Sequence, residues 1–194
     1  MKKDNSSTMI LGDTIGSFIK KAEKFHGSVA PGLLIGAFMV DLAVQRLPAG
    51  GLYDVLCETS HCLPDAVQML TPCTIGNGWL KIIDTGRFAM TFYDKTSGEG
   101  LRVFLDPSRL DAYDEIKAWF FRLKPKHEQS GERLIAEITG AAHSLFSLRP
   151  LSVRKSFLER PHKGRIALCP ECGEAYPSDH GPVCRGCQGA LPFD

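Results

Sequence analysis

The arrangement of cysteines at the carboxyl-terminal end of the chain constrains its fold more than any other feature. Two Cys-x-x-Cys pairs, Cys169/Cys172 and Cys184/Cys187, are separated by eleven residues. Each pair can wrap one turn of backbone around a metal ion and present two sulfur atoms at tetrahedral angles. With four thiolates bound, no position remains for water or substrate, so the spacing predicts one structural zinc ion. A redox-active dithiol pair is the alternative interpretation.

The segment around these cysteines is too short to bury a core of its own. Only 26 residues run from Cys169 to the last residue, so its folding energy must come mainly from the metal, about 10–16 kcal/mol of apparent binding in small zinc modules. The whole chain has 194 residues and is 43% hydrophobic, enough for one well-packed domain besides this module. We therefore expect a main domain at residues 1–150 and a basic linker with a zinc finger at residues 151–194.

Charge and composition argue against several classes of protein. The formal net charge is +1, so no overall field attracts nucleic acid or an acidic membrane. The longest apolar run, residues 32–40, ends at Asp41 and is too short to span a bilayer, and the amino terminus leads into no signal-peptide core. Seven cysteines, four of them in paired units, favour thiolate ligands in a reducing compartment over disulfides. We expect a soluble cytoplasmic protein without a membrane or nucleic-acid partner.

The hydrophobic pattern predicts helices before and after a mostly antiparallel set of strands, which is typical of an α+β domain. Asp13 is the expected N-cap of the first helix, and Gly27 its end. Arg87 and Arg102 suit solvent-facing positions on strands. Helices are predicted at residues 14–26, 31–47, 63–70, 107–123 and 130–148, and strands at residues 53–58, 80–83, 87–93 and 99–105.

A segment rich in cysteine precedes the third predicted helix. Cys57, Cys62 and Cys73 lie there with His61, and Cys62 is at or just before the helix N-terminus. Unpaired N–H groups at that position favour thiolate over thiol, which suits a metal ligand or a reactive sulfur. A buried, unreactive cysteine is the other interpretation, because free cysteine is among the most buried residue types.

One connector is distinctly basic. Residues 149–168 carry six arginines or lysines against the single acid Glu159. A basic patch can bind phosphate, but this one has no interleaved aromatic residues, which favours a solvated linker between domains.

A set of short motifs covers most of positions 20–105: Phe25-His26-Gly27, Pro31-Gly32-Leu33, Gly36, Glu58-Thr59, Cys62-Leu63, Asp65-Ala66, Gln68, Leu70-Thr71, Cys73-Thr74, Gly76, Phe88 to Asp94, Gly98-Glu99-Gly100 and Arg102-Val103. By these motifs the middle of the chain resembles the FmdE family, which is named after formylmethanofuran dehydrogenase. Longer members of the family carry a treble-clef zinc finger that the four terminal cysteines match.

The resemblance implies a mixed sheet flanked by helices, with a thioredoxin-like core, a homodimer and a metal site in that core. In the family the first loop reads His-Gly-His-x-Cys-Pro-Gly, but here Ser28 and Ala30 replace the second histidine and the first cysteine. Of that set only His26 and Cys62 remain, and two ligands rarely hold zinc. Our hypothesis is that the core pocket, formed by His26, Cys62, Cys73 and Arg102, persists but binds metal weakly or not at all.

Three functions remain open at this stage. The resemblance implies an accessory, metal-binding protein associated with molybdenum or tungsten formylmethanofuran dehydrogenase in methanogenesis-related one-carbon metabolism. No molybdopterin or iron–sulfur pattern is present, so the chain is not expected to carry the redox chemistry of that enzyme. The alternatives are a thiol-dependent enzyme that uses Cys62 with His26, and a zinc-finger module that binds nucleic acid or protein.

Overall fold

The computed structural model describes residues 8–159 and 164–193, and these divide into two compact units. The first unit extends to Leu158 and the second begins at Glu159. Arg160 and Lys163, which belong to the predicted basic connector, lie outside the described residues. In the described ranges, no helix has both the length and the apolar content that a membrane crossing requires.

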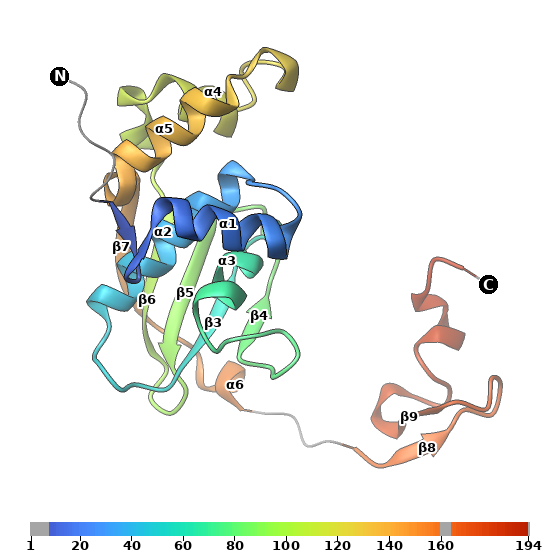
Figure 1. Ribbon diagram of the computed structural model, residues 1–194. Coiled ribbons are helices and arrows are strands. Elements are labelled where there is room, and N and C mark those ends of the chain that lie inside the picture. Colours follow the sequence, from blue (N-terminus) through green and yellow to red (C-terminus); the bar gives the residue numbers. More distant parts are fainter. Residues whose placement is uncertain (1–7, 160–163, 194) are drawn as a thin grey trace. The chain divides into compact units, whose positions relative to one another are not determined.

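A five-stranded mixed sheet forms the centre of the first unit, with strand order β4-β3-β5-β6-β7 (Figure 1). The strands β3 and β4 pair in parallel, whereas every other neighbouring pair is antiparallel. Their bounds are β3 Tyr53–Cys57, β4 Leu80–Ile82, β5 Ala89–Asp94, β6 Glu99–Leu105 and β7 Phe146–Ser152. The expected α+β class with a mixed sheet and flanking helices is confirmed.

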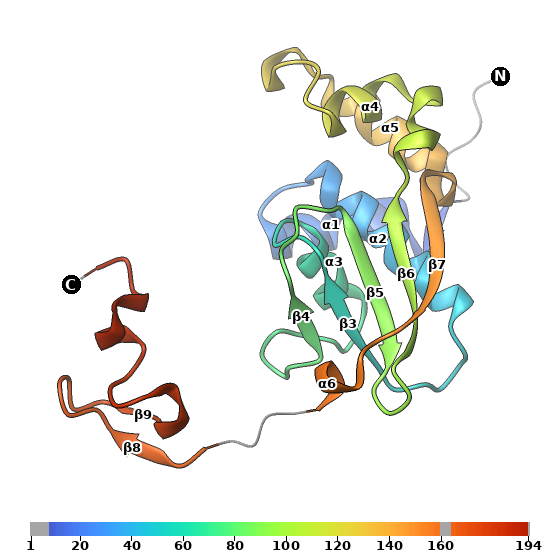
Figure 2. The same cartoon turned by 180° about the vertical axis from the view of Figure 1, so that it is seen from behind.

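Three helices, α1 (Ile15–His26), α2 (Pro31–Arg46) and α3 (Leu63–Leu70), cover one face of this sheet (Figure 1). Seen from behind in Figure 2, the other face carries, among the described elements of this unit, only the short helix α6 (Lys155–Leu158) near one end of the strands. Helix α2 is buried from Gly32 to Ala43 and is therefore the central element of the core.

Glycines on α2 set its close approach to α3. A Cβ atom added at Gly36 would lie 2.9 Å from Ala66 Cβ and 3.0 Å from Leu63 Cδ2. The helices can lie this close only because Gly36 has no side chain, and a larger residue there would push them apart.

A long excursion of the chain separates the neighbouring strands β6 and β7. It contains helices α4 (Asp114–Phe120) and α5 (Gly131–Ala141) and 3₁₀ turns at Pro107–Ala112, Lys126–Glu128 and Ala142–Leu145. The two ends of the excursion meet, because Asp106 N donates to Leu145 O at 3.0 Å. We call residues 106–145 the helical lobe.

A buried carboxylate attaches two distant segments to α2. Asp41, 3% exposed, accepts hydrogen bonds from Leu11 N at 2.8 Å and from Gln45 Nε2 at 2.8 Å, and pairs with His143 Nε2 at 2.6 Å. Leu11 connects the two short strands β1 (Met9–Ile10) and β2 (Asp13–Thr14). The aspartate in the middle of an apolar helix therefore anchors both the amino-terminal hairpin and the end of the helical lobe.

Several local predictions were wrong. The N-cap of α1 is Thr14, whose Oγ1 accepts from Ser17 N, and not Asp13, which bonds to Lys21. The predicted helix over residues 107–123 is a 3₁₀ turn followed by α4, and the predicted helix over residues 130–148 ends at Ala141, before strand β7. Ala142 ends α5 because its φ of 44° and ψ of −122° are not helical.

The second unit is small and has little regular structure. Strands β8 (Ile166–Leu168) and β9 (Ala175–Pro177) form a hairpin, followed by a 3₁₀ turn at Ser178–His180 and a helical turn at Gly186–Ala190. Tyr176 is the main apolar side chain buried beside Cys169 in this unit, and Tyr176 Oη donates to Gly181 O at 2.9 Å. So small a core cannot hold the unit folded without a further source of stability.

Candidate metal centre and core site

The four carboxyl-terminal cysteines converge on one point. Their sulfur atoms all lie within 4.8 Å of one another. The Sγ atoms of Cys169 and Cys187 are 3.8 Å apart, and those of Cys172 and Cys184 are 3.7 Å apart. A tetrahedral zinc ion with Zn–S bonds of about 2.3 Å requires sulfur–sulfur edges of about 3.8 Å. The arrangement therefore fits a zinc ion held by four thiolates.

Backbone amides point at these sulfur atoms, as in zinc knuckles. Cys184 N donates to Cys169 Sγ at 3.4 Å, and Cys187 N donates to Cys184 Sγ at 3.4 Å. Amide donors, first from Cys172 and then from Cys184, lower the pKa of Cys169 to about 6. The peptide backbone thus stabilises the thiolate form of Cys169.

In the first unit, His26 meets the first turn of α3. His26 Nδ1 lies 2.5 Å from Asp65 Oδ2, and the two side chains are 25% and 33% exposed. Asp65 comes three residues after Cys62, which is the N-cap residue of α3. The Asp65 carboxylate therefore fixes the orientation of the His26 ring near the N-terminus of α3, where Cys62 is the N-cap.

The backbone of Cys62 is unusual. Its φ is 57° and its ψ is −46°, in the region that favours glycine. A Cβ atom added at Gly32 would lie 2.9 Å from Cys62 Sγ and 3.5 Å from Phe88 Cζ. The thiol thus packs against the start of α2, in a position that the glycine makes possible.

Of the two interpretations of Cys62, the surroundings of the side chain favour the buried, unreactive thiol. Burial, and then the negative charge of Asp65, raise the pKa of the Cys62 thiol above its ordinary value. Within the described part of the chain, no hydrogen bond joins Cys62 to His26, and no group of three His, Cys, Asp or Glu ligand atoms other than the four-cysteine cluster is close enough to share an ion.

The other two predicted pocket residues lie elsewhere. Cys73 follows the opposite end of α3, is 3% exposed, and donates through Sγ to Tyr53 O at 3.3 Å. Arg102 lies on β6 between Leu101 and Val103; since Val103 faces the helices, Arg102 points to the other face of the sheet. The structure therefore brings His26 and Cys62 to the same helix end, but not Cys73 or Arg102.

Arg102 belongs to a charged cluster with Glu58. Its Nε and Nη2 atoms donate to the two oxygens of Glu58 at 2.5 Å and 2.9 Å, and Arg87 Nε lies 2.7 Å from Glu58 Oε2. The Glu58 side chain is only 7% exposed. Hydrogen bonds from Arg102 are the main reason that the pKa of Glu58 lies below its usual value. Arg102 is therefore already paired, and because its side chain is only 15% exposed, the expectation that it faces solvent was wrong.

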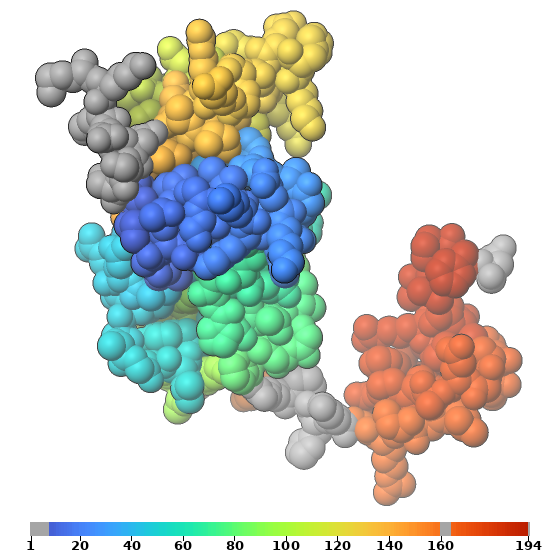
Figure 3. Space-filling model, in the orientation of Figure 1, coloured from blue at the N-terminus to red at the C-terminus, as the bar shows by residue number. Residues whose placement is uncertain are grey.

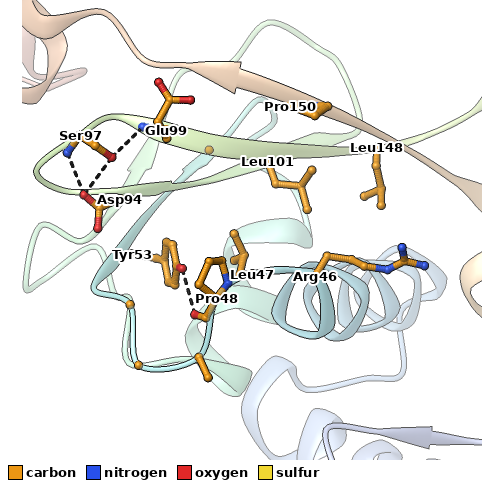
Figure 4. Close-up of a pocket in the computed structure, with 14 residues that line it drawn as sticks. Arg46, Leu47, Pro48, Tyr53, Asp94, Ser97, Glu99, Leu101, Leu148 and Pro150 are labelled. Atoms are coloured by element: carbon orange, nitrogen blue, oxygen red, sulfur yellow. Dashed lines mark hydrogen bonds between the residues drawn. The ribbon is translucent and has the colours of Figure 1, made fainter.

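A pocket of about 780 Å³ lies between the end of α2 and the β5–β6 turn (Figure 4). Two of its polar groups are already occupied: Tyr53 Oη donates to Pro48 O at 3.0 Å, and Asp94 accepts from Ser97 N at 2.8 Å within its own turn. Arg46, which lines it, is about 22 Å along α2 from Pro31, at 1.5 Å per residue. The pocket is therefore separate from the His26–Cys62 site.

Two family models match the chain. Residues 25–153 match the family described as "FmdE, Molybdenum formylmethanofuran dehydrogenase operon", and residues 160–194 match the FmdE treble clef zinc finger. The second match covers all four cysteines of the metal centre.

The proteins similar to this chain include one solved structure and one curated relative. A tungsten formylmethanofuran dehydrogenase FmdE-like protein from Syntrophus aciditrophicus has 51% sequence identity and a TM-score of 0.89, over 95% of this chain and 97% of that one. A probable S-adenosyl-L-methionine-binding protein from Archaeoglobus fulgidus is 32% identical over 101 residues. That match covers 48% of this chain and 28% of the relative, so the chain spans about a quarter of that protein's length.

Proposed function

Because the chain belongs to the FmdE family, we propose that it is an accessory, metal-binding protein of molybdenum- or tungsten-dependent formylmethanofuran dehydrogenase metabolism. Its zinc ion, held by Cys169, Cys172, Cys184 and Cys187, is structural in this proposal. The core is a binding domain whose family metal site has lost two ligands, Ser28 and Ala30 standing in their place.

One observation carries the metal-binding part of this proposal. The sulfur–sulfur distances of 3.7 Å and 3.8 Å match the edges of a zinc–thiolate tetrahedron. A site with four protein ligands has no open position for a substrate, which supports a structural zinc over a catalytic one. The link to the dehydrogenase is supported by the family and by the 51% identity to an FmdE-like protein.

Metal analysis tests the proposal. Protein purified without added metal is analysed by mass spectrometry as wild type, Cys172→Ser and Cys62→Ser. We expect one zinc ion per chain, lost in Cys172→Ser and retained in Cys62→Ser. Two ions per chain, one of them lost in Cys62→Ser, would mean that the core binds metal and would overturn the proposal that its family metal site is lost.

The partner is tested separately. The tagged full-length chain, expressed in its own host, should co-purify with a molybdenum- or tungsten-containing dehydrogenase. Its Cys172→Ser variant is the matched comparison, because loss of the zinc finger shows whether that unit makes the contact. Recovery of the chain free of the dehydrogenase under native conditions would contradict the proposed association.

We also propose a homodimer in a reducing compartment such as the cytoplasm. The free thiols of all seven cysteines fit such a compartment. Sedimentation velocity should give twice the chain mass of 21.3 kDa. A single species with the mass of one chain would contradict the dimer.

Thiol chemistry at Cys62 is a second candidate function with weaker support. Asp65 orients His26 as a base would require, at 2.5 Å. However, the pKa of Cys62 is raised, so the sulfur is a thiol at neutral pH. For this reason we prefer the accessory role.

A further inference from the structure

A second large cavity lies where the helical lobe meets the start of α2. Its volume is about 880 Å³, and its lining comes from Trp119 on α4, from the α4–α5 connection, from α5 and from Val29 and Pro31. In Figure 3 the yellow and orange lobe lies directly above the blue α1–α2 segment, and the cavity belongs to this junction. A cavity of this size can hold an organic molecule as large as a cofactor.

The floor of the cavity is apolar. Trp119, Leu134 and Ile135 form it together with the ring of Pro31. Leu134 is 2% exposed, whereas Trp119 and Ile135 are only partly buried and present apolar surface to the cavity. A flat aromatic or acyl group would find complementary contacts here.

The same floor is continuous with the surroundings of Cys62. Trp119 packs edge-on against Phe88, with ring centroids 6.3 Å apart. Phe88 and Cys62 both touch the space beside Gly32. A molecule in the cavity is thus linked to the surroundings of Cys62 through two rings in contact, those of Trp119 and Phe88.

The rim of the cavity is basic. Arg122, Lys124 and Lys126 line it, and none of the described aspartates or glutamates does. Lys124 Nζ is 3.9 Å from Glu115 Oε1, but neither Arg122 nor Lys126 forms an ion pair with any residue of the described ranges. Three cations beside an apolar floor are suited to a ligand with an anionic head and an apolar body.

Arg122 lies directly after the end of α4, in a left-handed backbone conformation that is unfavourable for arginine. After α4, Leu123 N donates to Ala118 O at 2.9 Å and Arg122 N donates to Trp119 O at 3.2 Å, with Arg122 at a φ of 54°. This is the helix-ending geometry in which glycine is usual. An arginine therefore occupies a position that glycine would fill with less strain.

We propose that this cavity binds a small amphipathic organic anion, with its carboxylate, sulfonate or phosphate at Arg122, Lys124 and Lys126 and its apolar body on Trp119 and Leu134. The proposal goes beyond the accessory and zinc-binding roles and does not depend on them. It assigns a small-molecule ligand to the helical lobe and gives the core domain a binding activity of its own.

The test uses the full-length zinc-loaded chain and 8-anilinonaphthalene-1-sulfonate, an aromatic sulfonate that fluoresces when its surroundings are apolar. We expect saturable binding of one molecule and energy transfer from tryptophan. The chain has two tryptophans. Energy transfer should fall in Trp119→Phe and persist in Trp79→Phe, because Trp79 does not line this cavity.

Charge variants test the rim. Arg122→Gly, which also suits the left-handed backbone, and Lys126→Gln should each weaken binding of the sulfonate about five-fold. Arg133→Gln on α5 is the matched control, because Arg133 does not line the cavity. N-phenyl-1-naphthylamine, the same aromatic body without the sulfonate, should bind more weakly, and equally to the wild type and to these three charge variants. Equal affinity of both probes, or no effect of Arg122→Gly and Lys126→Gln, would overturn the proposal.

Discussion

At the scale of single residues, the most consequential interaction is the ion pair between Glu58 and Arg102. Both oxygens of a nearly buried carboxylate are bound by one guanidinium, at 2.5 Å and 2.9 Å. Glu58 O also accepts from Thr85 N at 2.9 Å, so this residue fixes the loop that precedes Phe88. The pair therefore connects the end of β3 to β6 and to the wall of the core site.

Removing the charge of Glu58 should be costly. Glu58→Gln leaves Arg102 without its partner, and breaking a buried pair costs about 3 kcal/mol. Arg87→Gln should cost less than about 1 kcal/mol, because the Arg87 side chain is 64% exposed. Urea unfolding followed by tryptophan fluorescence measures both. Equal losses in the two variants would contradict a dominant role for Arg102.

The same pair predicts a dependence on pH. The folded state holds the pKa of Glu58 below the ordinary 4.5, so its stabilisation is complete above that value and is lost as the pH falls through the lower folded pKa. From about pH 5 to about pH 3 the wild type should lose more unfolding free energy than Glu58→Gln. Parallel pH profiles of the two proteins would argue against this contribution.

The raised pKa of Cys62 gives another prediction. Because burial and Asp65 disfavour the thiolate, the rate of iodoacetamide alkylation at Cys62 should still rise above pH 9.0, the ordinary value for a thiol. Peptide mass spectrometry separates Cys62 from the other cysteines. Asp65→Asn should shift the profile to lower pH. A rate that is already constant at neutral pH would instead favour thiol catalysis.

Residue contacts across long sequence distances were the least predictable from sequence. The family pattern points to His26 and Cys62, but the bond from His26 to Asp65 spans 39 positions and that from Arg102 to Glu58 spans 44. Neither pair shares a local spacing that would reveal it. In contrast, the four-cysteine cluster follows from spacing alone, because each pair of cysteines lies within one backbone turn.

At the scale of elements, prediction succeeded where local chemistry marks the ends. Gly27, the predicted end of the first helix, is the C-cap of α1 with a φ of 82°, and the predicted third helix, residues 63–70, is α3. Strand β7 was missed because apolar residues keep the helical spacing of α5 beyond its end, as far as Leu148. The segment therefore fitted a continuous helix. The alternation of Phe146, Leu148 and Pro150 was the available signal. Pro150 argued against a strand, because proline is rare in sheets. It is tolerated here because β7 is an edge strand.

The contact between α2 and α3 gives a prediction for these elements. Gly36→Ala should destabilise the core by about 1–3 kcal/mol, because the new methyl group would meet Ala66 and Leu63. Gly16→Ala on α1, where no atom lies within 4 Å, is the control and should cost nothing or stabilise by up to about 1 kcal/mol. Urea unfolding gives both values. If Gly36→Ala left the free energy of unfolding unchanged, the close contact between α2 and α3 would not limit stability.

At the scale of the whole molecule, the two units should respond differently to metal removal. The second unit has few buried apolar side chains, and metal binding of about 10–16 kcal/mol dominates the folding of such modules. A zinc chelator should therefore abolish amide-exchange protection around Cys169 to Cys187 and leave that of β5 unchanged. The Cys172→Ser variant should behave in the same way. Loss of protection in β5 would show that the first unit depends on the metal.

The excursion between β6 and β7 has a consequence for how such a chain can diverge. Leu105 pairs with Phe146, so the helical lobe is an insertion into a two-stranded β-hairpin whose base stays closed whatever lies between. The closure entropy of a loop grows only slowly with its length. Insertions, deletions or replacement of the lobe therefore leave the strand register intact. A lobe with another lining can be exchanged at this one position in the topology while the strand pairs of the sheet are kept.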